Sequence, residues 1–322
     1  MLDYQIKLLE AKIRGVEVSE LFGNTKLSQE QQELLEKYIE KLKSGYPLDY
    51  LLGEVHILEL RLKLNENVLI PRPETEEWLL DLGRHPQLDW VYPTTKSKSE
   101  NITINGHRHS EQVRSGGWTC SVTAFDTTSE ESPTIENNGS TKTNQNLLVD
   151  LGCGSGIIGL YLANFFEQIF AVDISPKALE IAKENATVNG INNIKFFLSD
   201  GLSDELLKNK ITYFCNNYTD WTLVANLPYV PISDKINEAE HKTQYEPDLA
   251  IYSGNDGLDL FRKVLVELES FETKPAQIIF ELDPRNIRIA SELLEKINYA
   301  TNIWIDSGGF ERVLIGNKIT HL

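Results

Sequence analysis

The sequence predicts an α/β fold with a doubly wound sheet, preceded by a small helical domain and a β-hairpin. Three observations support this prediction. An apolar strand runs into a glycine-rich turn and then a helix between residues 147 and 166. From there to residue 322, short apolar strands alternate with amphipathic helices, as in doubly wound sheets. Residues 1–46 instead repeat their apolar side chains at helical spacing.

The bulk composition favours a folded protein that does not bind polyanions. The chain has 322 residues, of which 41% are hydrophobic, enough for a sizeable core. Lys and Arg number 31 against 48 Asp and Glu, which gives a formal net charge of −17. Phosphate binding needs concentrated positive charge, and no basic patch interrupts this acidic balance. We therefore expect no direct binding to nucleic acid.

Cysteine usage and hydropathy indicate an intracellular protein. Cys120, Cys153 and Cys215 are scattered, without the spacing of metal ligands, and fit a reducing compartment. No signal peptide and no apolar run long enough to cross a bilayer is present. We expect a cytoplasmic, monomeric protein with no metal site and no membrane partner.

Residues 1–46 are predicted to form helices. Ser28 and Gln31 have the spacing of a capping box. Gly45 is expected to end the helix that they open. The apolar stripe of that helix consists of Leu34, Leu35, Tyr38, Ile39 and Leu42.

Residues 47–84 are predicted to form a linker and the start of the next domain. Val55–Leu60 and Arg61–Leu64 alternate apolar and polar residues as the strands of a hairpin would, and Glu66-Asn67 lies in a turn. Pro73 then opens a helix with acidic residues in its first turn.

Residues 85–146 are predicted to be a polar, disordered insertion, because Ser, Thr, Asn, His and Gly dominate them without apolar periodicity. Residues 147–322 then form the α/β domain. Its expected strands are Leu147–Leu151, Ile169–Asp173, Ile194–Leu198, Thr222–Asn226, Gln277–Leu282, Ala300–Ile305 and Arg312–Ile315. Its expected helices are Ile157–Phe166, Pro176–Asn189, Leu258–Phe271 and Ile287–Ile297.

The glycine-rich turn favours S-adenosylmethionine as the ligand. Asp173 ends the following strand, where a carboxylate can accept hydrogen bonds from ribose hydroxyls of either NAD or S-adenosylmethionine. The turn reads Gly-x-Gly-x-Gly over Gly152–Gly156 and lacks the Gly-x-Gly-x-x-Gly spacing that serves a pyrophosphate. Asp150 precedes it, and an acid there suits a ligand that carries a sulfonium and an ammonium group.

The loop Asn226-Leu227-Pro228-Tyr229 predicts the methyl acceptor. A planar NH2 group is a poor nucleophile because its lone pair is delocalised. The side-chain oxygen of Asn226 and a main-chain carbonyl such as that of Leu227 can accept its two hydrogens and hold the nitrogen for in-line attack. Pro228 stiffens the loop, and Tyr229 offers a flat face for a planar acceptor.

These motifs resemble the HemK/PrmC family of protein-(glutamine-N5) methyltransferases, which modify the glutamine of the Gly-Gly-Gln motif in peptide chain release factors. The resemblance covers nearly the whole chain except the insertion. The residues that carry it are Pro47–Gly53, Ile70–Glu76, Gly152–Gly156, Asp173, Asn226–Tyr229 and Glu246-Pro247 with Gly254–Leu258.

The resemblance implies a Rossmann-like S-adenosylmethionine-dependent methyltransferase domain over 147–322 and a release-factor-binding helical domain over 1–46. It assigns the glutamine side chain, and so catalysis and substrate binding, to Asn226, Leu227, Pro228 and Tyr229. It assigns the cofactor to Gly152, Cys153, Gly154, Ser155, Gly156, Asp173, Gly201 and Asn226. The family often has an aromatic residue near Gly201, so an adenine contact there is weakened.

Alternative functions stay open at this point. Leu227 stands where family members usually have proline, and Asn-Leu-Pro-Tyr also resembles the motif of ribosomal RNA adenine dimethyltransferases. Methylation of a ribosomal-protein glutamine, or of an adenine N6 in nucleic acid, is therefore the alternative enzymatic activity. A methyltransferase-like binding protein would instead have a degraded turn or lack Asn226, and this sequence keeps both.

Overall fold

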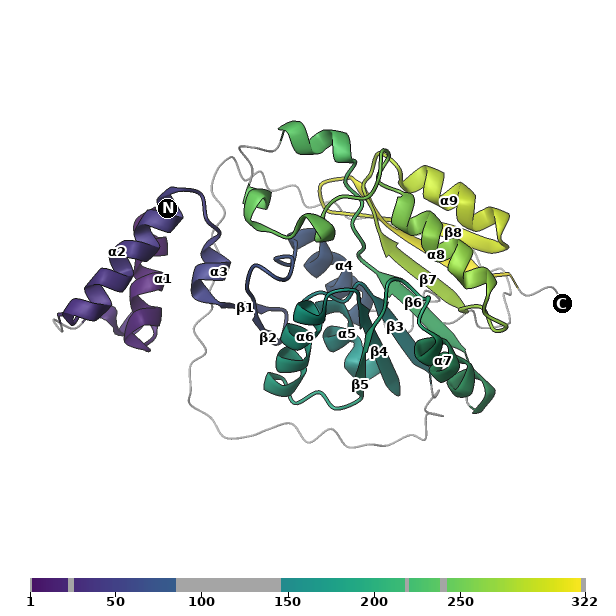
Figure 1. The fold of residues 1–322 in the computed structure, drawn as a ribbon, viewed down its shortest axis with the longest axis horizontal. Helices are drawn as coiled ribbons and strands as arrows, with labels where there is room; N and C mark the ends of the chain where they lie inside the picture. Colours follow the sequence, from purple (N-terminus) through teal and green to yellow (C-terminus); the bar gives the residue numbers. More distant parts are fainter. Residues whose placement is uncertain (1, 23–25, 85–145, 218–219, 238–241, 320–322) are drawn as a thin grey trace, which may run out of the picture. The chain divides into compact units, whose positions relative to one another are not determined.

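The computed structural model describes residues 2–22, 26–84, 146–217, 220–237 and 242–319 (Figure 1). Its centre is a seven-stranded sheet in the order β5-β4-β3-β6-β7-β9-β8, in which β9 runs antiparallel to both of its neighbours and the other pairs are parallel. The strands are β3 (Leu147–Leu151), β4 (Gln168–Asp173), β5 (Ile194–Leu198), β6 (Trp221–Ala225), β7 (Gln277–Glu281), β8 (Tyr299–Ile305) and β9 (Glu311–Lys318).

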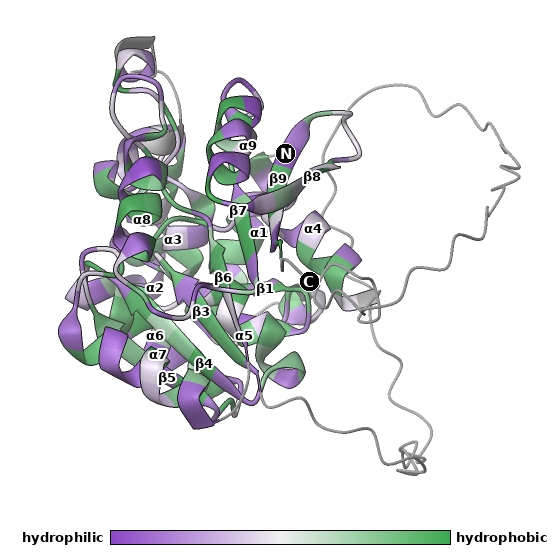
Figure 2. Ribbon diagram, turned by 90° about the vertical axis from the view of Figure 1, so that its right-hand side faces the viewer, coloured by the Kyte–Doolittle hydropathy of each residue, from purple (hydrophilic) through white to green (hydrophobic). Residues whose placement is uncertain are grey.

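The two faces of the sheet pack against different helices, which confirms the predicted doubly wound α/β fold. Leu147, Val149 and Leu151 face one core with helices α7 (Glu205–Asn217), α8 (Asp259–Glu269) and α9 (Ile287–Lys296). Leu148 faces the other core with helices α4 (Pro73–Arg84), α5 (Ile157–Tyr161) and α6 (Pro176–Val188). Because both faces are buried, the central strands β3 and β6 are mostly hydrophobic, with Asp150 and Thr222 as their polar residues (Figure 2).

Local signals explain where several of these helices begin. Ser175 caps α6 by accepting from the backbone N–H of Ala178 at 3.2 Å, and Pro176 occupies the first helical position. Pro73 opens α4 in the same way, as predicted. The helix expected to reach Phe166 is shorter, because α5 gives way to a 3-10 turn, η2 (Leu162–Phe165).

Helix α7 was not predicted. Asp204 caps it by accepting from the backbone N–H of Leu207 at 2.8 Å. Leu207, Ile211 and Phe214 form its buried stripe. The remaining short elements are the 3-10 turns η3 (Ile232–Asn237), η4 (Lys242–Tyr245) and η5 (Asp248–Ala250).

The N-terminal helices follow the sequence prediction closely. They are α1 (Leu2–Arg14), the 3-10 turn η1 (Val18–Phe22) and α2 (Gln29–Lys43). The capping box of α2 is complete, since the side chains of Ser28 and Gln31 each accept from the other residue's backbone N–H. An additional helix, α3 (Leu48–Leu52), was not predicted; it ends at Gly53, which has a left-handed φ of 72°.

The predicted hairpin is present, but its turn lies elsewhere. Strands β1 (Glu54–Ile57) and β2 (Leu60–Lys63) pair antiparallel around a two-residue turn at Leu58-Glu59. Leu58 adopts a positive φ of 56°, as such turns require. Leucine rarely adopts a positive φ, so no residue at this position predicts the turn. The prediction that Leu58–Leu60 extends the first strand is therefore wrong. The expected turn at Glu66-Asn67 is confirmed.

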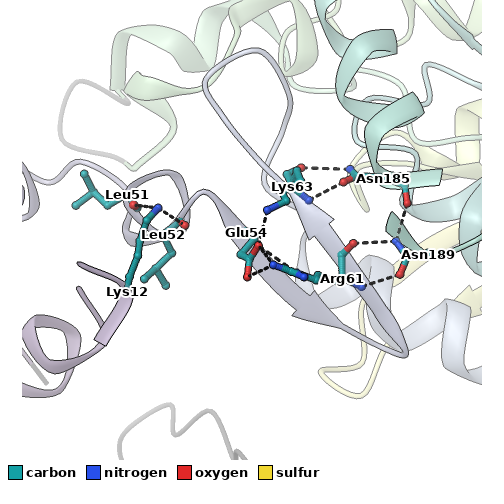
Figure 3. Close-up of polar contacts among 8 residues, drawn as sticks. All are labelled: Lys12, Leu51, Leu52, Glu54, Arg61, Lys63, Asn185 and Asn189. Carbon is teal, nitrogen blue, oxygen red and sulfur yellow. Dashed lines mark hydrogen bonds and ion pairs between the residues drawn. The ribbon is translucent and has the colours of Figure 1, made fainter. Parts of the chain in front are cut away.

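Two asparagines hold the hairpin against α6 (Figure 3). Asn185 accepts from the backbone N–H of Lys63 at 2.6 Å and donates to its carbonyl at 3.2 Å. Asn189, one helical turn further, makes the same pair of bonds to Arg61 at 3.0 and 2.8 Å. The two side chains thus make the hydrogen bonds to the backbone of β2 that a further neighbouring strand would otherwise make.

Lys12 of α1 donates in a similar way to the carbonyl of Leu51 at 2.8 Å and to that of Leu52, at the C-terminal end of α3 (Figure 3).

The predicted insertion over 85–146 lies, apart from Asn146, outside the described residues. The domain boundaries given above remain predictions. In the described ranges, no helix is long and apolar enough to cross a bilayer.

Candidate active site

A pocket opens at the carboxyl edge of the parallel strands, where ligands of open α/β sheets bind. Residues that follow β3, β4, β5 and β6 line it on the sheet side, and residues 67–75 and 247–250 line it from outside the sheet. The pocket brings together nine of the predicted site residues: Gly152, Cys153, Gly154, Ser155, Asp173, Gly201, Asn226, Leu227 and Pro228.

The glycine turn is fixed to the sheet and open toward the pocket. Backbone N–H groups of Gly152 and Cys153 both donate to the carbonyl of Val172 on β4, at 2.8 and 2.9 Å. Gly152 has a φ of 70°, and a Cβ there would lie 2.6 Å from Cδ2 of Leu227. Gly154 has a φ of 53° and faces open space. Glycine is therefore needed both for the turn and for close approach of a ligand.

Asp173 ends β4 with its carboxylate held in place. Its Oδ2 accepts from the N–H of Gly154 at 2.9 Å and its Oδ1 from the N–H of Ser175 at 2.8 Å. Burial raises the pKa of Asp173, and these backbone bonds oppose the shift. Each oxygen keeps a further lone pair, so the carboxylate can accept hydroxyl hydrogens on its pocket side.

Asp150 does not contact the pocket, which corrects the role inferred from its place before the turn. The alternation of β3 turns it toward α5, where it is fully buried and accepts from the N–H of Gly159 at 2.8 Å. Its Oδ1 has no partner among the described residues. Burial raises the pKa of Asp150 to about 7. It therefore joins β3 to α5 and does not meet a cationic ligand.

Gly156 and Tyr229 lie just outside the lining. Gly156 is the N-cap of α5, with a φ of 85°. The hydroxyl of Tyr229 lies 3.5 Å from Glu281 Oε1, a long contact, and burial raises the pKa of this phenol. Stacking of Tyr229 on a planar acceptor stays a prediction.

Thr75, Trp78 and Glu281 form a buried cluster behind Asn226 that the sequence analysis missed. Thr75 donates its hydroxyl hydrogen to Glu281 Oε2 at 2.7 Å, and the indole N–H of Trp78 donates to the same oxygen at 2.8 Å. The amide nitrogen of Asn226 donates to Thr75 Oγ1 at 3.2 Å. A carboxylate that ends a buried apolar strand, as Glu281 does, was the available signal.

The two cationic residues that line the pocket, Arg72 and Lys263, each pair with a carboxylate. Arg72 bonds to Glu246 at 2.5 Å, and Glu246, only 6% exposed, also accepts from the N–H of Ile70 at 3.1 Å. Lys263 pairs with Asp200 at 2.5 Å, beside Gly201. Both cations of the lining are thus already neutralised, which leaves little positive charge for a phosphate group.

The pocket fits S-adenosylmethionine on its own geometry. The glycine turn admits a ligand close to the backbone, Asp173 can bind ribose hydroxyls, and apolar side chains form a wall suited to an adenine ring. That wall includes Ile174, Leu249, Ala250, Leu260 and Val264. The fold and the pocket together define a methyltransferase of the α/β class.

Comparison with known proteins supports this class. Residues 142–235 match a family model described as a methyltransferase domain. The release factor glutamine methyltransferase of Deinococcus radiodurans is 28% identical over 279 residues, covering 85% of this chain and 75% of the relative. That of Thermodesulfovibrio yellowstonii is 28% identical over 299 residues, covering 92% and 85%.

Among solved structures, a ribosomal protein L11 methylase from Lactobacillus delbrueckii is 19% identical, covers 54% of this chain and 70% of its own, and has a TM-score of 0.36. The predicted resemblance, the methyltransferase activity class and the cofactor S-adenosylmethionine are confirmed by the family model and the curated relatives. The roles of individual site residues remain proposals.

Proposed function

We propose that this chain transfers a methyl group from S-adenosylmethionine to the side-chain amide nitrogen (N5) of the glutamine in the Gly-Gly-Gln motif of peptide chain release factors. One observation carries the proposal: Asn226, Leu227 and Pro228 line the same pocket as the glycine turn and Asp173. The names of the curated relatives support the same acceptor.

The residues act mainly by orientation. Bound S-adenosylmethionine supplies an electrophilic methyl group. The Oδ1 atom of Asn226 accepts one N–H of the glutamine amide and the carbonyl of Leu227 accepts the other, so that the nitrogen lone pair points at the methyl group. As the N–C bond forms, the S–C bond of the donor breaks, S-adenosylhomocysteine leaves, and the nitrogen releases one of its two hydrogens to solvent as a proton. Holding a reactant in an attack geometry can contribute about 7–11 kcal/mol without a strong base. Leucine retains the carbonyl on which this role depends.

Adenine in nucleic acid is the second candidate because of the Asn-Leu-Pro-Tyr sequence. The paired state of Arg72 and Lys263 and the net charge of −17 argue against a polyanionic substrate. A ribosomal-protein glutamine would use the same chemistry and must be separated by experiment.

The test uses the full chain, labelled S-adenosylmethionine and four substrates. These are a release factor, its Gly-Gly-Ala variant, a ribosomal-protein fraction and ribosomal RNA. We expect label on the release factor alone. Equal labelling of the release factor and its Gly-Gly-Ala variant would overturn the glutamine assignment, and preferential labelling of RNA would favour the adenine alternative.

A further inference from the structure

The side chain of Asn226 is connected to the interior of the protein through the hydroxyl group of Thr75. Thr75 Oγ1 lies 3.2 Å from the amide nitrogen of Asn226 and 2.7 Å from Glu281 Oε2. Thr75 and Glu281 are each 1% exposed, so the contact between them is shielded from water. Thr75 lines the same pocket as Asn226.

The direction of these hydrogen bonds is determined by Glu281. An ionised carboxylate can only accept, so the indole N–H of Trp78 and the hydroxyl of Thr75 both donate to Oε2 of Glu281. The hydroxyl hydrogen of Thr75 is then committed to the same oxygen. The Thr75 oxygen is left able only to accept, and the Asn226 group that faces it must be the NH2 end of the amide.

This constraint matters because an asparagine amide can be turned by 180° at little cost in shape. With its nitrogen held by Thr75, Asn226 presents Oδ1 as its remaining group. Turned the other way, it would present two N–H donors to a substrate amide that also donates. Only the first orientation can accept a hydrogen from the nitrogen that is to be methylated.

We propose that Thr75 and Glu281 are positioning residues that orient the Asn226 amide, so that its oxygen is available to the methyl acceptor. This inference rests on the proposed function, since it concerns how the same acceptor is held. Neither residue touches the reacting atoms.

The fold explains how the three residues meet. β6 and β7 are neighbours paired at Ala225 and Phe280, so Asn226 and Glu281 each lie one residue beyond that pair. Ile279 belongs to the core that contains α4, and alternation along β7 turns Glu281 to the same face. Thr75 and Trp78 lie three residues apart on α4, which places both on the side facing Glu281.

Substitutions at Thr75 test the proposal on release-factor methylation by the full chain. Thr75→Val has nearly the same shape but no hydroxyl, and we expect it to lower kcat by about tenfold to a hundredfold, within the range of other orientation effects. Thr75→Ser restores the hydroxyl and should recover activity to within about threefold of wild type. The Kd for S-adenosylhomocysteine should change by less than about threefold in both variants.

Trp78→Phe is the matched control, because it removes the other donor to Glu281 Oε2 and leaves the Thr75–Asn226 contact intact. We expect it to retain kcat within about threefold of wild type. A second readout needs no turnover: in protein labelled with 15N at asparagine, the Asn226 NH2 signals are identified by their absence from Asn226→Asp. Thr75→Val should shift them and Thr75→Ser should not.

The outcomes are distinguishable. A wild-type protein that fails to methylate the release factor overturns the proposed function and this inference with it. An active wild type with Thr75→Val equally active, or with Thr75→Ser as impaired as Thr75→Val, overturns the inference alone. If Thr75→Val does not fold, Thr75→Ala takes its place with the same expectations.

Discussion

Asn226 is the residue on which the proposed chemistry depends most directly. It is the first residue after β6, lines the pocket and is held from behind by Thr75. Its proposed role is to accept a hydrogen from a neutral amide, a task that no neighbouring side chain of the loop Leu227–Tyr229 can take over with the same geometry.

We therefore predict that Asn226→Ala abolishes methyl transfer. Asp173 and the glycine turn remain intact in this variant, so the affinity for S-adenosylhomocysteine should stay within about tenfold of wild type. Single-turnover transfer and calorimetric binding measure the two quantities separately. Substantial turnover by Asn226→Ala would refute the role given to this side chain.

Asp150 gives a prediction about stability at the residue scale. Burial raises its pKa to about 7 in the folded chain, against a usual value of 3.8. Between pH 3.8 and about pH 7, Asp150 is protonated in the folded protein and ionised in the unfolded chain. The stability contributed by Asp150 is complete below about pH 4 and is lost as the pH rises through about 7.

Asp150→Asn cannot titrate, yet its side-chain oxygen can still accept from Gly159. We predict that the Tm of wild type falls more steeply between pH 5 and pH 8 than the Tm of this variant. Thermal unfolding at constant ionic strength measures both curves. Because Asp173 and Glu281 titrate in both proteins, the difference isolates Asp150, and parallel curves would contradict the assignment.

At the scale of elements, α6 connects the hairpin to the cofactor side of the pocket. Asn185 binds β2 through Lys63, and its amide nitrogen also donates to the carbonyl of Ser155 in the glycine turn at 2.9 Å. Asn185 is fully buried. One side chain thus joins the hairpin, the helix and the turn, and its removal would take a hydrogen-bond partner from the buried carbonyl of Ser155 and from the partly buried N–H and C=O of Lys63.

We predict that Asn185→Ala lowers the free energy of unfolding by about 1–3 kcal/mol, the cost of unsatisfied buried polar groups. Asn189→Ala should cost less, because water can reach the backbone of Arg61, where these bonds are exposed. Urea unfolding gives the values, and Asn192→Ala, which removes one exposed bond, is the control. Equal losses for Asn185→Ala and Asn192→Ala would show that the buried bonds to β2 and Ser155 contribute little.

The elements that could be predicted from sequence are those with their own local signals. Apolar runs identified β3 and β4, and Ser175 with Pro176 marked the start of α6. The Leu58 turn could not be predicted, because a leucine with positive φ is tolerated only through its surroundings.

The same distinction holds for the candidate site. The glycines of the turn and Asp173 could be predicted from the sequence, because their roles depend on the local backbone conformation and on their position at the end of a strand. The Thr75–Glu281 contact joins residues 206 positions apart in the sequence, so it could be identified only in the folded structure. The contact of Asp150 with α5 depends on which face of β3 it occupies, and the apolar run alone does not reveal that face.

At the scale of the whole molecule, the site draws on residues that are far apart in sequence. The pocket is lined by residues 67–75 before the predicted insertion and by residues 151–264 after it. Leu82 of α4 and Leu148 of β3 belong to the same core. The two flanks are therefore held together by packing between described residues on either side of the predicted insertion.

We predict that replacing residues 94–143 with a short Gly-Ser linker leaves both fold and activity in place. Closing a shorter loop between flanks that already share a core costs little entropy, because this cost grows only slowly with loop length. We expect a Tm within a few degrees of wild type and a kcat/KM for the release factor within about threefold. A deletion variant that keeps its Tm and its affinity for S-adenosylhomocysteine but loses methyl transfer would contradict this expectation. It would assign residues 94–143 to recognition of the protein substrate, and a scrambled segment of the same length and composition would then separate a sequence-specific contact from a simple spacer.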